Sequence, residues 1–150
     1  MRYIAVFIII IALGCKGKHK GLQKSGKTET VSEELTLVLS DNYGGAEQQE
    51  IQVIRSKGAL KNFFTEINKT RKPGIPVPKI DFSKEMVVIY CSGKTTDAKI
   101  PGLYMISESD DKLTLGVKKQ NLEETTSSAV LVPFGLYTMA ITDKEVVLEQ

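Results

Sequence analysis

From residue 32 onward, the chain is built from short stretches in which apolar and polar residues alternate, the pattern of half-buried β-strands. Residues 34–40 and 47–55 show this alternation on either side of a turn cluster at 41–45, whose two glycines suit positive φ angles. Two sets of residues compete for the buried face of the first strand: Leu35 with Val38, or Leu37 with Leu39. Further strands are predicted at 86–91, which is apolar throughout and therefore central, and at 103–106, 112–117, 128–132, 136–141 and 145–148.

One segment, residues 57–69, follows a helical period instead. Apolar side chains recur there at positions i, i+3, i+4 and i+7, which predicts an amphipathic helix packed on the sheet. These side chains are Leu60, Phe63, Phe64 and Ile67, and we expect all four in the core. Ser56 is the predicted N-cap, and the proline-rich residues 70–79 predict an irregular crossover after the helix.

These elements predict one globular domain over residues 32–150, of the α+β class and mainly β. We expect an antiparallel sheet or sandwich of about seven strands with one amphipathic helix at 57–69. The composition, 41% hydrophobic and 25% charged, is typical of a globular chain. Residues 32–150 carry 14 basic and 17 acidic side chains, so this part lacks the basic field that nucleic-acid binding requires.

The N-terminus has the composition of an export signal. An uninterrupted apolar run at residues 3–13 follows Arg2; as a helix it would rise about 16 Å, short of the roughly 30 Å hydrocarbon core of a bilayer. Residues 1–14 are therefore predicted to be a signal peptide. The sequence Ala-Leu-Gly-Cys ending at Cys15 resembles the lipobox of bacterial lipoproteins, which implies that Cys15 is acylated. The alternative is an ordinary signal peptide that ends at an incidental cysteine.

Residues 15–31 contain five lysines and almost no apolar side chains, so we interpret them as a flexible tether. An acylated Cys15 would attach the protein to a membrane of the bacterial cell envelope, and the lysines would be attracted to anionic head groups. Lys16 differs from the acidic residue that resembles an inner-membrane retention signal, which favours the outer membrane.

Signals for catalysis and for cofactors are sparse. The single histidine, His19, lies in the tether, so no histidine can activate a nucleophile in the folded domain. Cys91 lies in the most apolar run, where a thiol is expected to be inert. The adjacent carboxylates at 110–111 and 123–124 are typical of solvated turns. We therefore expect no enzymatic activity, no metal and no cofactor.

Two glycine-flanked tyrosines mark the candidate partner-contacting residues: Tyr43, Gly44 and Gly45 in one segment, and Gly102, Leu103 and Tyr104 in the other. Exposed strand edges beside such segments suit an extended partner that adds a strand, and tyrosine is a frequent interface anchor. The alternative is that both tyrosines cover the rim of the core.

Residues 78–150 resemble the PrcB C-terminal domain. The matching motifs are Ile80-Asp-Phe at the start of a strand, Gly93-Lys94, Gly102-Leu103-Tyr104 where the family usually has Gly-Gly-Tyr, an acidic hairpin and a late Pro133-Phe134. Residues 95–101 form a longer insertion here. The family takes its name from a lipoprotein that stabilises a secreted protease complex. The resemblance therefore implies a non-catalytic interaction domain of the cell envelope, with a protease among the partners it suggests.

Together these observations favour a membrane-anchored lipoprotein whose domain holds or stabilises an envelope or secreted protein. One alternative is an inhibitor or small-ligand-binding lipoprotein, in which the loop at 95–101 enters the active site of a protease or lysozyme. Another is a hydrolase, which needs carboxylates converging from separate strands.

Overall fold

The computed structural model describes residues 35–97, 102–118 and 126–149, which form one helix and nine strands. The helix is α1 (Lys57–Ile67), and the strands are β1 (Thr36–Asp41), β2 (Gln49–Ile54), β3 (Glu85–Ser92), β4 (Thr95–Asp97), β5 (Gly102–Glu108), β6 (Lys112–Lys118), β7 (Thr126–Leu131), β8 (Phe134–Ala140) and β9 (Glu145–Leu148). The fold is α+β and mainly β, as predicted. Cys15 and the tether lie outside the described residues. Within those residues, no helix has the length and apolar character that crossing a bilayer requires.

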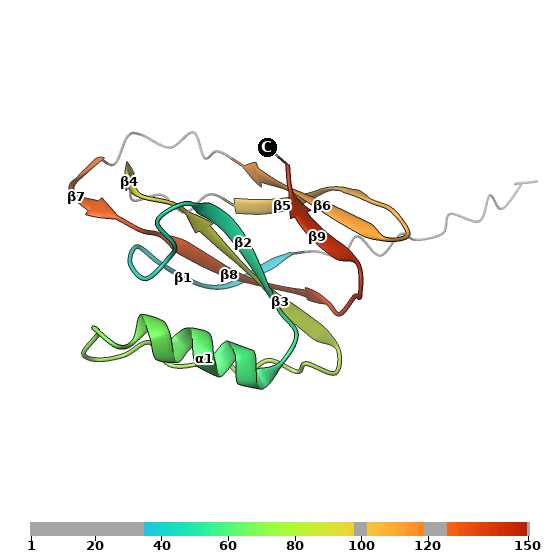
Figure 1. The fold of residues 1–150 in the computed structure, drawn as a ribbon, viewed down its shortest axis with the longest axis horizontal. Helices are drawn as coiled ribbons and strands as arrows, with labels where there is room; N and C mark the ends of the chain where they lie inside the picture. Colours follow the sequence, from blue (N-terminus) through green and yellow to red (C-terminus); the bar gives the residue numbers. More distant parts are fainter. Residues whose placement is uncertain (1–34, 98–101, 119–125, 150) are drawn as a thin grey trace, which may run out of the picture. The chain divides into compact units, whose positions relative to one another are not determined.

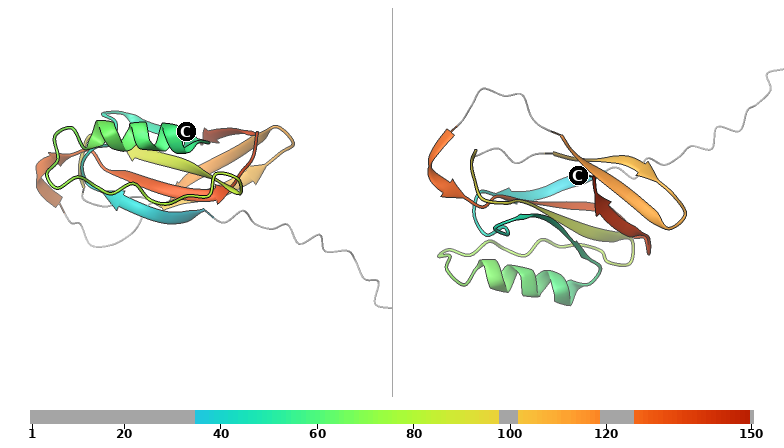
Figure 2. Two further views of the ribbon diagram at one scale, coloured as in Figure 1. Left: turned by 90° about the horizontal axis from the view of Figure 1, so that it is seen from below. Right: turned by 45° about the horizontal axis from the view of Figure 1, so that its top comes forward.

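The central layer is an antiparallel sheet of four strands in the order β1-β8-β3-β2. α1 covers one of its faces, and a three-stranded sheet in the order β5-β6-β9 covers the other (Figures 1 and 2). β4 follows β3 after an interruption at residues 93–94, β7 precedes β8 before an interruption at 132–133, and β4 and β7 pair with each other. We call α1 with the irregular chain that follows it the helix layer, the four-stranded sheet the central sheet, and the β5-β6-β9 sheet the outer sheet.

β3 explains how the central sheet is covered on both faces. Every side chain from 86 to 91 is buried, which confirms the predicted central strand. Alternate side chains enter two separate cores, because neighbours in a strand point to opposite faces. Val87, Ile89 and Cys91 pack with the helix layer, and Met86, Val88 and Tyr90 pack with the outer sheet. The run is continuously apolar because neither face meets water.

α1 begins and packs as its sequence predicts. The Ser56 hydroxyl accepts a hydrogen bond from the backbone N–H of Ala59 at 3.2 Å, which confirms the N-cap. Leu60, Phe64 and Ile67 are buried, and the half-buried Phe63 meets Phe134 edge to face with ring centroids 5.5 Å apart. The helix ends at Ile67, two residues earlier than predicted, and Asn68 is its C-cap.

The strand prediction needs two corrections. The described residues form nine strands rather than about seven: each of the eight segments predicted above is a strand, and β4, a short polar segment, was not predicted. The arrangement is also not antiparallel throughout. β9 pairs parallel to β6.

β1 follows neither of the two alternatives for its buried face. A shift in its pairing with β8 occurs between Leu37 and Leu39, so the residues on either side of this bulge face opposite cores. Leu35 packs against the outer-sheet core and Leu39 against the helix-layer core. Leu37 and Val38 remain exposed.

Candidate functional site

The segment Tyr43-Gly44-Gly45 lies in the loop between β1 and β2. Gly44 has the predicted positive φ, +99°, but Gly45 does not and is required for another reason. A Cβ atom on Gly45 would lie 2.6 Å from the carbonyl oxygen of Pro133, and its N–H donates to the carbonyl of Val132 at 2.9 Å. Gly45 therefore lets the loop pack on the break between β7 and β8, which is a structural role.

Arg71 also binds this loop, through hydrogen bonds to Asp41 and Tyr43. Its guanidinium donates two hydrogen bonds to the carboxylate of Asp41 and one, at 3.1 Å, to the carbonyl of Tyr43. The N–H of Tyr43 donates to Asp41 Oδ1 at 2.7 Å. The Tyr43 ring is 50% exposed, beside an open depression that Lys72 and Pro73 also line.

The segment Gly102-Leu103-Tyr104 opens β5. Leu103 is buried in the outer-sheet core, whereas Tyr104, which points the other way, is 46% exposed. Ile106 lies beside it and is also exposed. A Cβ atom on Gly116 of β6 would lie 2.6 Å from the Tyr104 ring and 2.8 Å from Ile106 Cδ1, so the bare glycine lets both side chains lie close to the sheet. We call Tyr104, Ile106 and Gly116 the outer β5 surface.

β5 is an outer strand of its sheet. Within the described residues its ladder partner is β6, and its other side carries no strand. A bulge between Met105 and Ser107 interrupts the regular pairing, so a further strand would fit best along its first half. The Gly102–Tyr104 segment lies in that half.

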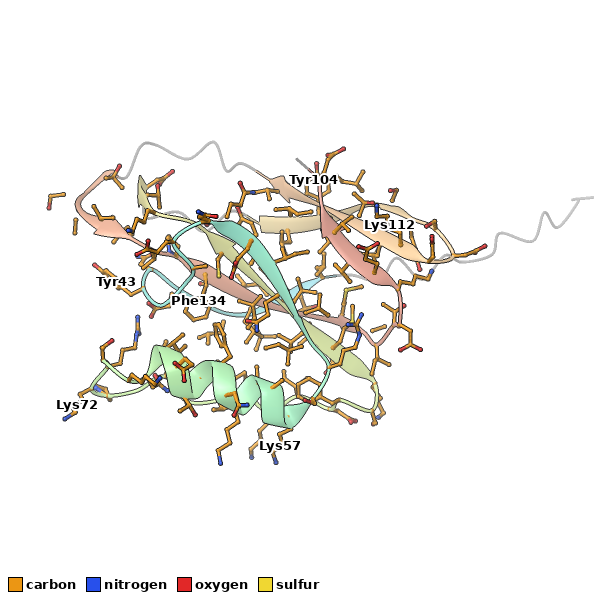
Figure 3. The ribbon with its side chains drawn as sticks, in the orientation of Figure 1. Tyr43, Lys57, Lys72, Tyr104, Lys112 and Phe134 are labelled. Atoms are coloured by element: carbon orange, nitrogen blue, oxygen red, sulfur yellow. The ribbon has the colours of Figure 1, made fainter. Side chains whose placement is uncertain are left out.

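The structure does not bring the two tyrosines together. Tyr43 lies at the end of the central sheet near the helix layer, and Tyr104 lies on the outer sheet (Figure 3). They belong to separate surfaces, and each side chain is about half exposed. Of the insertion at 95–101, residues 95–97 form β4, and 98–101 lie outside the described residues.

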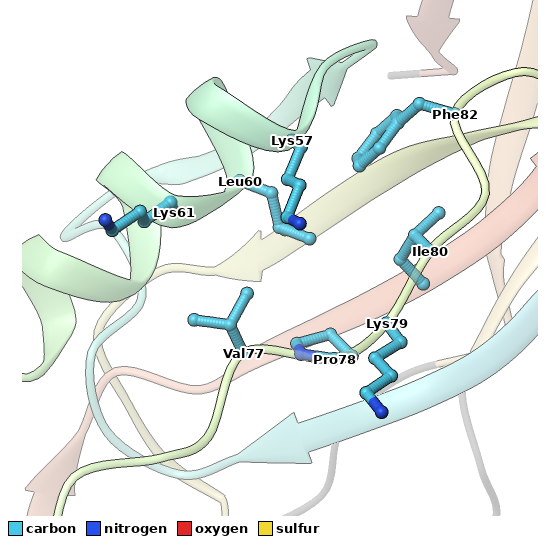
Figure 4. Close-up of a pocket in the computed structure, with 8 residues that line it drawn as sticks. All are labelled: Lys57, Leu60, Lys61, Val77, Pro78, Lys79, Ile80 and Phe82. Carbon is cyan, nitrogen blue, oxygen red and sulfur yellow. The ribbon is translucent and has the colours of Figure 1, made fainter.

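A third site was missed from the sequence. A cavity of about 440 Å³ lies between α1 and the chain at 77–82 (Figure 4). Its walls are apolar and its rim carries lysines: the walls are Leu60, Val77, Pro78, Ile80 and Phe82, and the rim is Lys57, Lys61 and Lys79. We call it the lysine-rimmed groove. A neighbouring pocket of about 310 Å³ shares Lys61 and Val77 with it.

The free wall of this groove is fixed at both ends. The Asn68 side chain, at the end of α1, donates to the carbonyl of Ile75 at 2.9 Å and accepts from its N–H at 2.8 Å. Farther along, Ile80 and Phe82 pack against the helix-layer core. The chain then turns at Asp81, whose pKa is lowered by hydrogen bonds from Ser83. The groove is thus formed before any ligand arrives.

The remaining candidate groups have structural surroundings. Burial raises the pKa of the Cys91 thiol, which agrees with an inert core residue, and burial also raises the pKa of Tyr90 and Tyr137. Asp110 and Asp111 are exposed in the β5–β6 turn, and the carboxylates at 123–124 lie outside the described residues. In the part of the chain that is described, no three His, Cys, Asp or Glu residues gather around a metal-sized space.

No known protein family, curated protein or solved structure matches the chain. The resemblance of residues 78–150 to the PrcB C-terminal domain therefore stays a prediction.

Proposed function

We propose that the chain is a lipid-anchored protein of the bacterial cell envelope whose domain binds another envelope or secreted protein without catalysing a reaction. The observation that supports this best is the outer β5 surface. There, an outer strand carries an exposed tyrosine and an exposed isoleucine side by side.

The chemistry of this surface suits an extended protein segment. A partner strand beside the first half of β5 would pair with the backbone on its outer side and cover Tyr104. Tyrosine contributes strongly at interfaces because its large ring loses little conformational freedom on binding. The partner is then held by shape and backbone pairing, with the protease suggested by the PrcB resemblance as a specific candidate.

The anchor in this proposal is the acylated Cys15. Acyl chains contribute about 0.8 kcal/mol for each buried CH₂ group, so two or three chains hold a small domain on a bilayer. The tether of residues 15–31, fully extended, spans at most roughly 60 Å. It would let the domain reach partners near the membrane, the outer membrane being the favoured location.

The anchor is tested by Cys15→Ser, for which we expect the protein to leave the membrane fraction. A Cys15→Ser variant that sediments with membranes as the parent does would contradict the lipid anchor.

The binding surface is tested by affinity purification of the tagged full chain from its own envelope in mild detergent. We expect one protein to co-purify in near-equal amount. Tyr104→Ser should lower its recovery about tenfold or more, the loss typical of an interface anchor. Tyr43→Ser is the matched control, because that ring is similarly exposed on another surface. Equal recovery with Tyr104→Ser, or no co-purifying protein at all, would contradict the proposal.

A small-ligand-binding lipoprotein is the second candidate function. The lysine-rimmed groove favours it, because preformed apolar cavities of a few hundred Å³ are the usual form of small-molecule sites.

A further inference from the structure

Lys57 and Lys61 occupy positions on α1 that are unfavourable for positive charge. Lys57 is the first residue of the helix, where the peptide dipoles leave partial positive charge, and the first turn carries no acidic residue. Lys61 follows four residues later, and like charges at this spacing repel each other. Glutamate at position 57 would suit the helix better.

No carboxylate in the described part of the chain compensates these charges. The ion pairs found there use other basic residues, namely Lys69, Arg71, Lys84, Lys94 and Lys144. Lys79, on the facing wall, is also without an ion pair among the described residues. Three unpaired amines therefore surround one cavity, although Lys72, Lys112 and Lys118 show that unpaired lysines also occur elsewhere.

The cavity between these lysines is apolar. Five apolar side chains form its walls, and its volume of about 440 Å³ is within the usual range for small-ligand sites. In Figure 4 the side chain of Lys57 runs beside Leu60, while those of Lys61 and Lys79 extend outward from the two walls. The adjoining pocket, which shares Lys61 and Val77, extends the groove along α1.

We propose that the lysine-rimmed groove binds a free fatty acid. The acyl chain would lie between α1 and residues 77–82, and the carboxylate would face the amine of Lys57, with Lys61 and Lys79 adding positive charge at the rim. A small inorganic anion would leave the apolar walls in water, and a neutral lipid would leave the three charges uncompensated. A single-chain carboxylate supplies both an apolar chain for the walls and a negative charge for the lysines. This site is separate from the outer β5 surface and does not depend on the function proposed for it.

The test uses the full chain in phosphatidylcholine nanodiscs, with a photoreactive fatty acid that carries a diazirine on its chain. The matching fatty alcohol is the uncharged control probe. After irradiation, we expect the acid to label peptides containing Leu60 and residues 77–82, and the alcohol to label them at least about tenfold less, because the alcohol lacks the charge that would pair with a lysine amine.

The matched variants separate charge from fold. Lys57→Gln/Lys61→Gln/Lys79→Gln should lose labelling by the acid about tenfold or more, whereas Lys112→Gln/Lys118→Gln, which changes exposed lysines of β6, should keep it. Equal labelling by acid and alcohol, or unchanged labelling of the triple variant, would overturn the proposal. Phosphatidylglycerol in the disc that competes as well as free fatty acid would also overturn it, in favour of a bilayer head group.

A second measurement distinguishes binding from a structural role. Removing three unpaired positive charges should leave the melting temperature of the ligand-free chain unchanged or raise it, while labelling falls. A triple variant that loses labelling and melts at lower temperature would show that the lysines support the fold, and the assignment to a ligand would be wrong.

Discussion

The two layers that cover the central sheet differ in how they are held and in what they present to solvent. The outer sheet is joined internally by strand pairing, and its Leu113 and Leu115 are completely buried against β3 and β8. The helix layer consists of one helix and an irregular chain. Side-chain contacts join them, such as the two hydrogen bonds between the Asn68 side-chain amide and the backbone of Ile75.

This difference separates two kinds of recognition surface. Strand pairing creates a regular outer sheet with an exposed strand edge, which suits an extended protein segment. The irregular chain cannot pair in this way, so it stands off from α1 and leaves an apolar cavity. The two proposed sites thus belong to the two layers that cover opposite faces of the central sheet, the outer β5 surface to one and the lysine-rimmed groove to the other, and each is testable without the other.

The largest effect is expected where the helix layer meets the central sheet. Phe64 is 1% exposed, so Phe64→Ala should lower the free energy of unfolding by about 3–5 kcal/mol through lost burial and a cavity. Leu115→Ala in the outer sheet should cost about 2–5 kcal/mol. Urea unfolding followed by circular dichroism measures both. Because side chains of β3 belong to both cores, each variant should still unfold in a single cooperative transition. Two separate transitions would mean that the layers unfold independently.

The second prediction weakens only the helix layer. Asn68→Ala removes both partners of the part-buried Ile75 backbone and should cost about 1–3 kcal/mol. Hydrogen exchange at the Ile75 amide should accelerate, while exchange within β6 changes by no more than the global loss of stability requires. Thr65→Ala is the control. The exposed Thr65 hydroxyl donates to the backbone carbonyl of Lys61 within the helix, so we expect the free energy of unfolding to change by at most about 0.5 kcal/mol. An unchanged Ile75 exchange rate would mean that other contacts hold the groove wall.

How far the sequence predicts this molecule depends on the range of the interactions involved. α1 and β3 are predictable because their burial is written into local periodicity, and the alternation of Leu103 with Tyr104 indicates one buried and one exposed side chain. β4 has no such pattern, because its three residues are polar. The apolar residues of β9 indicate a strand, but its parallel neighbour β6 is decided by the global topology.

The candidate sites follow the same division. Tyr104 could be predicted as a surface residue, but its contact with Ile106 and Gly116 could not. Gly116 matters only because β6 places it under Tyr104 and Ile106. The prolines at 73, 76 and 78 indicate an irregular chain, yet the groove depends on the distance between that chain and α1. Lysines that flank apolar residues at 57–61 and 77–80 were the available signal.

The third prediction compares two glycines. Gly45→Ala would place a methyl group against the backbone of Pro133, which cannot move freely, so we expect a cost of about 1–3 kcal/mol. Gly116→Ala meets only the ends of half-exposed side chains, so its cost should stay below about 1 kcal/mol. It should nevertheless lift Tyr104 and Ile106 and reduce partner recovery. Thermal unfolding and affinity purification measure the two effects, and equal destabilisation by both variants would contradict this distinction.

The smallest predicted effect is a gain in stability from Lys57→Glu. A carboxylate in the first turn of α1 interacts favourably with the helix dipole, by about 0.3–1 kcal/mol, and a glutamate four residues before Lys61 adds about 0.2–0.5 kcal/mol. Urea unfolding at low and high salt measures the gain, which should shrink as salt screens the charges. Lys118→Glu, an exposed position at the end of β6 opposite Gly102, is the control and should change stability by no more than about 0.5 kcal/mol. Lys57→Glu should at the same time weaken labelling of the groove by the fatty acid. A variant that is more stable but binds less fatty acid would show that the native lysine is retained for its ligand. A loss of stability would instead show that Lys57 supports the helix layer.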